Sequence, residues 1–274
     1  MPVDVSDESR ISLYPVDLTA EKQINEVFQN FKPHTVIHTA SPSYLDTTGA
    51  LMKTNVEGTT ALLRVSTDCP DTQAFVFTSS NSAVVPTQEP ISEDDAQQVD
   101  KTNAPSVYGL SKAIAERLVA SANSERLYTS ILRIPGIYGE YDTNFVPQLV
   151  SSMRRKEHKM QVGNDNKLFE FLYVKKAAEA HILAMKALLD PKIRGQAGGE
   201  AFFISDGKPQ YFFEFSRRFY AAAGNPVAPE EVTKIPFSVM EAMASMTEWL
   251  YWIFTLGMVQ PSLRRISIDH LDKA

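Results

Sequence analysis

The stretches that decide the fold read FVFTSS at residues 75–80 and SVYGLSKAIAERLVASA at residues 106–122. The first is a short apolar run that ends in three hydroxyl residues, which predicts a buried strand over residues 74–78 with a polar carboxyl end. The second predicts a long helix, because its apolar residues recur at helical spacing. A buried strand followed by a long helix indicates a βα unit and a parallel sheet.

The same alternation continues on both sides of these stretches. Up to residue 139, strands are expected at 12–18, 35–40 and 128–134, and helices at 20–31 and 55–67. Beyond it the pattern loosens, with helices expected at 145–155, 176–189 and 212–223 and strands at 170–174 and 201–204. We therefore expect an α/β protein with a doubly wound parallel sheet over residues 1–139 and a smaller C-terminal lobe over residues 140–274, interleaved with the sheet.

The amino-acid composition limits the kinds of partner and metal that this protein is expected to bind. The 274 residues include 27 basic and 33 acidic side chains, a net charge of −6, which argues against a nucleic-acid backbone as partner. The single cysteine, Cys69, excludes an internal disulfide and fits a reducing compartment. The histidines and this cysteine show no metal-ligand spacing, so no metal site is expected. The polar, acidic N-terminus does not resemble a signal peptide.

The most apolar segment is WLYWIFTLGMV at residues 249–259, which is too short to cross a bilayer. Its aromatic density leaves two interpretations open. It forms either a buried or substrate-facing helix, or a patch that contacts a membrane surface. The methionines before it, such as Met243 and Met246, suit an apolar ligand and suit ordinary core packing equally well.

Tyr108 and Lys112 carry the clearest chemical signal. Residues four apart on a helix share one face. A phenol with an ordinary pKa near 10 is a poor base at neutral pH, and a neighbouring ammonium lowers that pKa. Such a pair can remove a proton from a substrate hydroxyl. Taken alone, the spacing is also typical of chance neighbours on a helix.

Polar residues at the ends of the predicted strands strengthen that interpretation. Ser80 follows a buried strand, and ligands of open α/β sheets bind beyond the carboxyl ends of the strands. Residues 78–80 could instead only satisfy the backbone of a turn. Asn55 could serve a proton relay or merely cap a helix. For His38, a strand-end residue with a satisfied ring is favoured over a catalyst.

Six segments, in order, resemble the extended short-chain dehydrogenases/reductases: DLT (17–19), VIHTASP (36–42), NVEGT (55–59), FVFTSS (75–80), YGLSK (108–112) and LRIPGIYGE (132–140). The HTASP form, YVKKAAEAHILA (173–184) and FFISDGKPQYFFEF (202–215) resemble the 3β-hydroxysteroid dehydrogenase branch, and within it the sterol-4α-carboxylate 3-dehydrogenases. The resemblance covers nearly the whole chain and implies a Rossmann-type sheet.

This resemblance implies NAD(P)-dependent oxidoreduction at the secondary, 3β-type alcohol of a sterol, steroid or related terpenoid, with NAD or NADP as cofactor. Tyr108 would be the general base, and Lys112 would lower its pKa and bind the nicotinamide ribose. Ser80 would orient the substrate oxygen, and Asn55 would support a proton relay. Cofactor contacts would come from Asp4, Asp17, Leu18, Ala40, Ser41, Tyr108, Lys112 and Pro135. The proline of LRIPG stands one residue later than in the commoner LRP form.

The family also opens with a strand, a glycine-rich turn and a helix that bind the pyrophosphate. This sequence has no glycine before Gly49. We therefore expect the first βα unit to be missing, a C-terminus that is short as well, and weak binding of NAD(H) by the chain as given. Three explanations stay open: an incomplete or mis-called gene, a diverged protein that lost cofactor binding, or an active variant that holds its cofactor differently.

Alternatives to the sterol enzyme also stay open. One is a reductase of the plant flavonoid type, and another is a non-catalytic binding protein that keeps the substrate lobe. A small apolar substrate is the expected partner, and nucleic acid is not. Peripheral membrane contact through residues 249–259 and a homodimer are further hypotheses. The location would be the cytoplasm or the endoplasmic reticulum membrane.

Overall fold

The computed structural model describes residues 11–87 and 89–255, without the side chains of residues 250 and 252–255. The chain divides into two compact units. The first comprises Met1–Val85, Ile91–Glu140 and Leu172–Ser205, and the second Pro86–Pro90, Tyr141–Phe171 and Asp206–Ala274. A stretch beyond residue 139 thus returns to the first unit. The assignment of a nucleotide-binding region to residues 1–139 and of a substrate lobe to residues 140–274 stays a prediction.

A four-stranded sheet organises the first unit. Its parallel strands are β1 (Thr35–His38), β2 (Ala74–Ser80), β3 (Tyr128–Ile134) and β8 (Ala201–Phe203), in the order β1-β2-β3-β8. Because all strands run in the same direction, their polar carboxyl ends meet at one edge. In register, His38 lies beside Phe77, and Ser80 beside Ile134. The predicted α/β class with a parallel sheet is confirmed.

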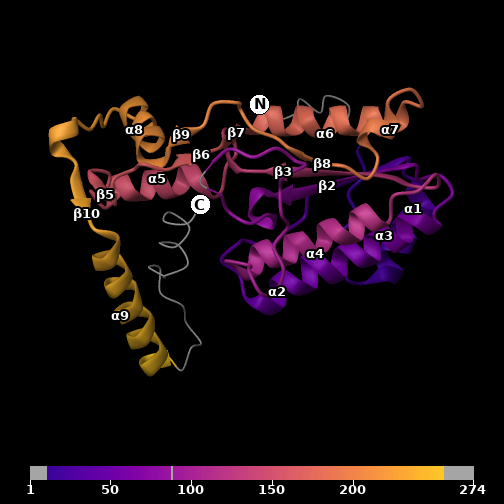
Figure 1. The fold of residues 1–274 in the computed structure, drawn as a ribbon. Coiled ribbons are helices and arrows are strands. Elements are labelled where there is room, and N and C mark those ends of the chain that lie inside the picture. The colour runs from indigo at the N-terminus through magenta and orange to yellow at the C-terminus, as the bar shows by residue number, and fades with distance from the viewer. Residues whose placement is uncertain (1–10, 88, 256–274) are drawn as a thin grey trace. The chain divides into compact units, whose positions relative to one another are not determined.

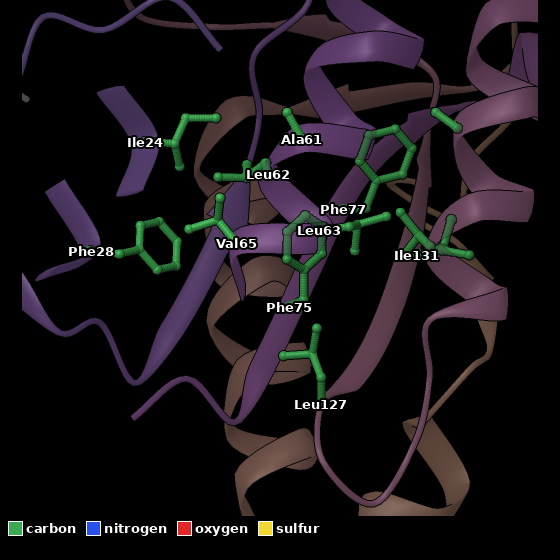
Figure 2. Close-up of a cluster of buried hydrophobic side chains, with 12 residues drawn as sticks. Ile24, Phe28, Ala61, Leu62, Leu63, Val65, Phe75, Phe77, Leu127 and Ile131 are labelled. Atoms are coloured by element: carbon green, nitrogen blue, oxygen red, sulfur yellow. The ribbon is translucent and has the colours of Figure 1, made fainter. Parts of the chain in front are cut away.

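Helices cover both faces of this sheet (Figure 1). On one face lie α1 (Glu21–Phe31), α3 (Thr59–Asp68) and α4 (Val107–Ser121), and on the other lies α6 (Val174–Leu189). Figure 2 shows the apolar cluster under the first set, where the rings of Phe75 and Phe77 are almost fully buried. Burial of each such ring contributes about 1.5–3 kcal/mol. This core holds α4, and with it the YGLSK sequence, against β2.

The remaining elements are short, apart from three helices of the second unit. The first unit also contains α2 (Thr48–Met52), the π-helix η2 (Lys53–Gly58), the 3-10 helix η3 (Asn81–Ala83), β4 (Gly136–Tyr138) and α7 (Arg194–Ala197), while β7 (Phe171–Tyr173) spans the boundary. The second unit contains α5 (Phe145–Arg154), β5 (Met160–Val162), β6 (Leu168–Phe169), β9 (Gln210–Tyr211), α8 (Phe212–Ala222), η4 (Pro229–Glu231), β10 (Thr233–Ile235) and α9 (Phe237–Thr255).

The strand predicted at residues 12–18 is wrong. Residues 11–17 have no regular structure, and residues 18–19 form a turn. A strand needs a hydrogen-bonded neighbour, and among the described residues β1 pairs only with β2. The apolar side chains that suggested a strand therefore stay uncovered: Leu13 is 88% exposed.

Candidate functional site

Tyr108 lies in the first turn of α4, close to the carboxyl end of β2. The helix begins there because Ser106 caps it: the Ser106 hydroxyl accepts a hydrogen bond from the Gly109 N–H at 3.1 Å. Residue 109, directly after Tyr108, has to be glycine. A Cβ on Gly109 would lie 2.2 Å from the Ser82 carbonyl oxygen, in the segment that follows β2. This close approach sets how near the phenol comes to the strand end.

We expect Gly109→Ala to destabilise the first unit by about 1–3 kcal/mol, because backbone must move to admit the methyl group. It should also reduce turnover, since Tyr108 moves with the helix start. The matched control is Gly195→Ala, where a Cβ meets nothing within 4 Å and stability should change by less than about 1 kcal/mol. Urea unfolding of both variants measures the difference, and equal stabilities would contradict the close-approach argument.

Two serine hydroxyls lie near the Tyr108 phenol. Ser80, the last residue of β2, and Ser41, which follows β1, lie near the Tyr108 side chain and act to lower its pKa. Burial acts more strongly in the opposite direction, so that the pKa of Tyr108 is raised above its ordinary value. The sequence-based argument expected a lowered pKa beside Lys112. That expectation is wrong for the chain alone, because loss of hydration outweighs the favourable contacts.

Lys112 is buried, with only 2% of its surface exposed. Its ammonium donates a hydrogen bond to the Thr78 carbonyl at 2.9 Å and lies 5.1 Å from the centre of the Phe77 ring and 5.9 Å from that of Tyr108. Burial lowers the pKa of Lys112 to about 8, while the Glu116 carboxylate favours the charged form. The ammonium is therefore charged at neutral pH and lies on the same side of α4 as the phenol.

Asn55 sits inside a continuous helical stretch that runs from α2 through η2 to α3, which rules out the capping role. Its amide donates to the Ser111 hydroxyl at 2.9 Å, and that hydroxyl donates to the Tyr108 carbonyl at 2.7 Å. The amide oxygen of Asn55 is buried and has no hydrogen-bond partner among the described residues. The structure thus ties Asn55 to the start of α4, and its relay role stays a prediction.

His38 is buried, and its Nε2 lies 2.9 Å from the Thr59 hydroxyl. Burial and the nearby Lys112 charge lower the pKa of His38 to about 4, so the ring is neutral at pH 7. This agrees with the interpretation of a satisfied strand-end histidine.

We expect His38 to make folding sensitive to acid. Its folded pKa of about 4 lies below the value of 6.5 in an unfolded chain, so the unfolded chain takes up the proton first as the pH falls. Stability is therefore lost between pH 6.5 and 4, by roughly 3 kcal/mol in all. The His38→Gln variant should lose about 2 kcal/mol less between pH 7 and 4.5. Urea unfolding at both pH values tests this, and parallel losses in the two proteins would refute it.

The predicted adenine contacts lie in the turn before α1. The Asp17 carboxylate accepts hydrogen bonds from the Thr19 N–H and hydroxyl, which lower its pKa. Leu18 packs against Gly58, where an added Cβ would lie 3.3 Å from the Leu18 Cβ. Leu18 therefore packs on the helical stretch that carries Asn55, and Asp17 pairs with Lys53 of the same stretch at 3.8 Å.

The other predicted cofactor contacts are spread over two strand ends. Ala40 is exposed just beyond β1, and Pro135 lies directly after β3. Asp4 lies outside the described residues. The structure thus gathers Tyr108, Lys112, Ser80 and Ser41 at one edge of the sheet.

The groups gathered at this edge fit the nicotinamide and its ribose, which form one half of a nicotinamide dinucleotide. An ammonium, a phenol and hydroxyls at the carboxyl ends of parallel strands suit a ribose and a nicotinamide amide. A glycine-rich turn at a helix start, which suits a pyrophosphate, does not occur in the described residues: α1 begins after Ala20 without a side-chain cap. We keep the individual cofactor contacts, and weak binding of NAD(H), as predictions.

Sequence reasoning missed a buried charged cluster beside the site. Glu116 is fully buried and accepts hydrogen bonds from Arg133 at 2.9 and 3.1 Å, from the Ser79 hydroxyl at 2.5 Å and from Gln98 at 2.6 Å. The only available signal was its position four residues after Lys112, on the same helix face. The partners come from other elements, which spacing along the chain does not identify.

Comparison with known proteins identifies the family. The profile of the 3-beta hydroxysteroid dehydrogenase/isomerase family matches residues 3–236. The chain belongs to this family. It is 68% identical over 258 residues to the decarboxylating sterol-4-alpha-carboxylate 3-dehydrogenase of Gibberella zeae, covering 93% of this chain and 85% of the relative. Identity to the Schizosaccharomyces pombe enzyme of the same description is 35%, over 88% of this chain and 69% of the relative.

Solved structures confirm the fold of this family member. The Bordetella bronchiseptica enzyme WbmH in complex with NAD+ gives a TM-score of 0.64 at 18% identity, over 81% of this chain and 68% of that one. UDP-glucose 4-epimerase from Brucella ovis in complex with NAD gives 0.64 at 22% identity, over 81% and 70%. The predictions of a Rossmann-type fold and of an NAD(P)-dependent oxidoreductase of the 3β-hydroxysteroid dehydrogenase type are confirmed.

Proposed function

We propose that this chain oxidises the 3β-hydroxyl of a sterol that carries a 4α-carboxylate. The relatives that share 68% and 35% identity are named for this reaction. The observation that carries the proposal is the meeting of Tyr108, Ser80 and Lys112 at the carboxyl edge of the sheet. The relatives give no support to the two alternatives, a flavonoid-type reductase and a non-catalytic binding protein.

The chain's own groups supply the proton chemistry. The Ser80 hydroxyl would hold the substrate oxygen, and the Tyr108 phenolate would take the proton of the 3-hydroxyl as the C–H bond breaks. The buried Lys112 ammonium stabilises that phenolate. A bound NAD(P)+ supplies the acceptor for the hydride that leaves carbon 3. The phenol of the chain alone has a raised pKa, and Lys112 loses its charge above a pKa of about 8, so turnover should rise from neutral pH only up to about that value.

The name of the relatives also implies loss of the carboxylate. Oxidation at carbon 3 turns a 4-carboxylate into a β-keto acid. In such an acid the bond from carbon 4 to the carboxyl carbon breaks readily, because the electron pair moves into the new carbonyl group. Carbon dioxide leaves, and carbon 4 takes up a proton. This step requires no further catalytic residue beyond groups that hold the ketone.

The test incubates the chain with a 4α-carboxysterol and NAD or NADP, and follows nicotinamide absorbance and the 3-ketone product by mass spectrometry. A 3-ketone that has lost the 4-carboxylate supports the proposal. Calorimetric titration with each cofactor is run in parallel. Cofactor binding without any product would contradict the proposed substrate. Absence of both binding and product would contradict catalysis by the chain as given.

We also propose that α9 contacts a lipid surface. Val239, Met243, Met246 and Trp249 are 46–63% exposed and lie on one face of this helix. None of the described helices is long and apolar enough to cross a membrane. A helix with one exposed apolar face is typical of interfacial binding. We extend this proposal to contact with the endoplasmic reticulum membrane. We propose separately that the chain forms a homodimer, which light scattering tests.

We expect Met246→Glu with Trp249→Glu to reduce co-sedimentation with phosphatidylcholine vesicles at least fivefold, because two charges would have to enter the interface. Leu183→Glu is the matched control, since Leu183 is 65% exposed on α6, outside α9. Equal vesicle binding by the wild-type chain, the double variant and the control would contradict the proposed lipid contact of α9. Residues 252–259 of the predicted contact segment have side chains outside the described part.

A further inference from the structure

His181 lies on α6, on the face of the sheet opposite α4 (Figure 1). It is buried, with 7% of its surface exposed. Its Nδ1 lies 2.7 Å from the Ala177 carbonyl oxygen, and its Nε2 lies 2.7 Å from the Thr78 hydroxyl. No step of the proposed reaction uses this ring.

The hydrogen-bond pattern assigns the tautomer. A carbonyl oxygen only accepts, so Nδ1 must carry the proton that it donates to Ala177. In the neutral ring, Nε2 then accepts, and the Thr78 hydroxyl donates to it. The side chain of Thr78 is thereby held by a residue that lies 103 positions further along the chain.

The same residue also holds Lys112 through its backbone. The Thr78 carbonyl accepts the hydrogen bond of the Lys112 ammonium at 2.9 Å. Thr78 thus connects helices on opposite faces of the sheet. Its hydroxyl hydrogen-bonds with His181 of α6, and its carbonyl accepts from Lys112 of α4. A shift of the Thr78 backbone, which the contact between its hydroxyl and His181 restrains, would move the carbonyl acceptor away from the ammonium.

We propose that His181 is a positioning residue that acts through Thr78 to hold the Lys112 ammonium beside Tyr108. This inference deepens the proposed function, on which its catalytic meaning rests. The ring of His181 touches neither reacting atoms nor Lys112 itself. Its effect passes through one side-chain and one backbone hydrogen bond of a single residue.

The test reads the titration of Lys112 directly, without cofactor or substrate. The chain is labelled with 13C at lysine Cε, the Lys112 signal is assigned by Lys112→Arg, and the shift is followed from pH 6 to 11. The charged or titratable groups near this ammonium are Glu116 and Tyr108 on α4 and His38 on β1, and none of them is changed.

We expect His181→Leu and Thr78→Val each to move the Lys112 midpoint by at least half a pH unit from its value near 8. The double variant should shift no further than either single variant, because both remove the same connection. Thr78→Ser keeps the hydroxyl, and His181→Gln keeps an acceptor, so both should restore the wild-type midpoint.

Ser130→Ala is the matched control. Ser130 is a buried serine of the adjacent strand β3, and its hydroxyl has no partner within the described residues. It should leave the Lys112 titration unchanged. Circular dichroism checks that each variant is folded. If His181→Leu does not fold, Thr78→Val, which keeps the shape of the side chain, tests the contact between His181 and Thr78. An unchanged midpoint in a folded Thr78→Val or His181→Leu variant would overturn the inference. Absence of sterol oxidation by the wild-type chain would instead count against the proposed function alone.

Discussion

Replacing Tyr108 by phenylalanine should reduce sterol oxidation by the cofactor-loaded chain by 10²–10⁴-fold, on the order of 3–5 kcal/mol in the activation barrier. Ser80 and Ser41 lie near the phenol, and in the proposed reaction the phenol oxygen takes the proton of the substrate hydroxyl. The variant loses one oxygen atom and keeps the ring that packs at the start of α4. Folding should therefore persist while turnover falls.

Initial rates under saturating substrate measure this effect, and circular dichroism checks the fold. Tyr14→Phe is the control, because Tyr14 is 42% exposed and lies outside the site. It should keep wild-type turnover. A Tyr108→Phe variant that turns over at the wild-type rate would remove Tyr108 from the role of general base.

The second large effect is expected at Glu116. Its carboxylate is fully buried against Arg133, whose side chain is 5% exposed, and their closest atoms lie 2.9 Å apart. Removing one partner of a buried ion pair leaves the other charge without compensation, which costs about 3–5 kcal/mol. Glu116→Ala also leaves the Ser79 hydroxyl and the Gln98 amide without their acceptor. We therefore expect this variant to be the most destabilised of those considered.

The measurement has to follow the first unit, because both tryptophans, Trp249 and Trp252, belong to the second. Hydrogen exchange of the β2 and β3 amides in urea does so. The matched control is Glu21→Ala, which breaks the exposed pair between Glu21 and Arg64 and should cost less than about 1 kcal/mol. If Glu116→Ala costs no more than that control, the buried pair does not stabilise the sheet.

Much of the fold could be predicted from the sequence, because periodicity is a local property. The alternation of strands and helices identified β2, β3 and α4 within a few residues. The predicted strand at residues 12–18 failed for the opposite reason: a strand is stable only beside another strand, and its local pattern contains no information about that neighbour.

The candidate site, too, was predictable from the sequence only in part. The sequence by itself determined that Tyr108 and Lys112 share a helix face and that Ser80 ends a strand, since both follow from spacing. Only the tertiary structure decided the direction of the Tyr108 pKa, because burial depends on every element packed around the phenol. It also decided that His181, 103 residues away, hydrogen-bonds Thr78, since residues so distant in the chain meet only when helices pack on the sheet.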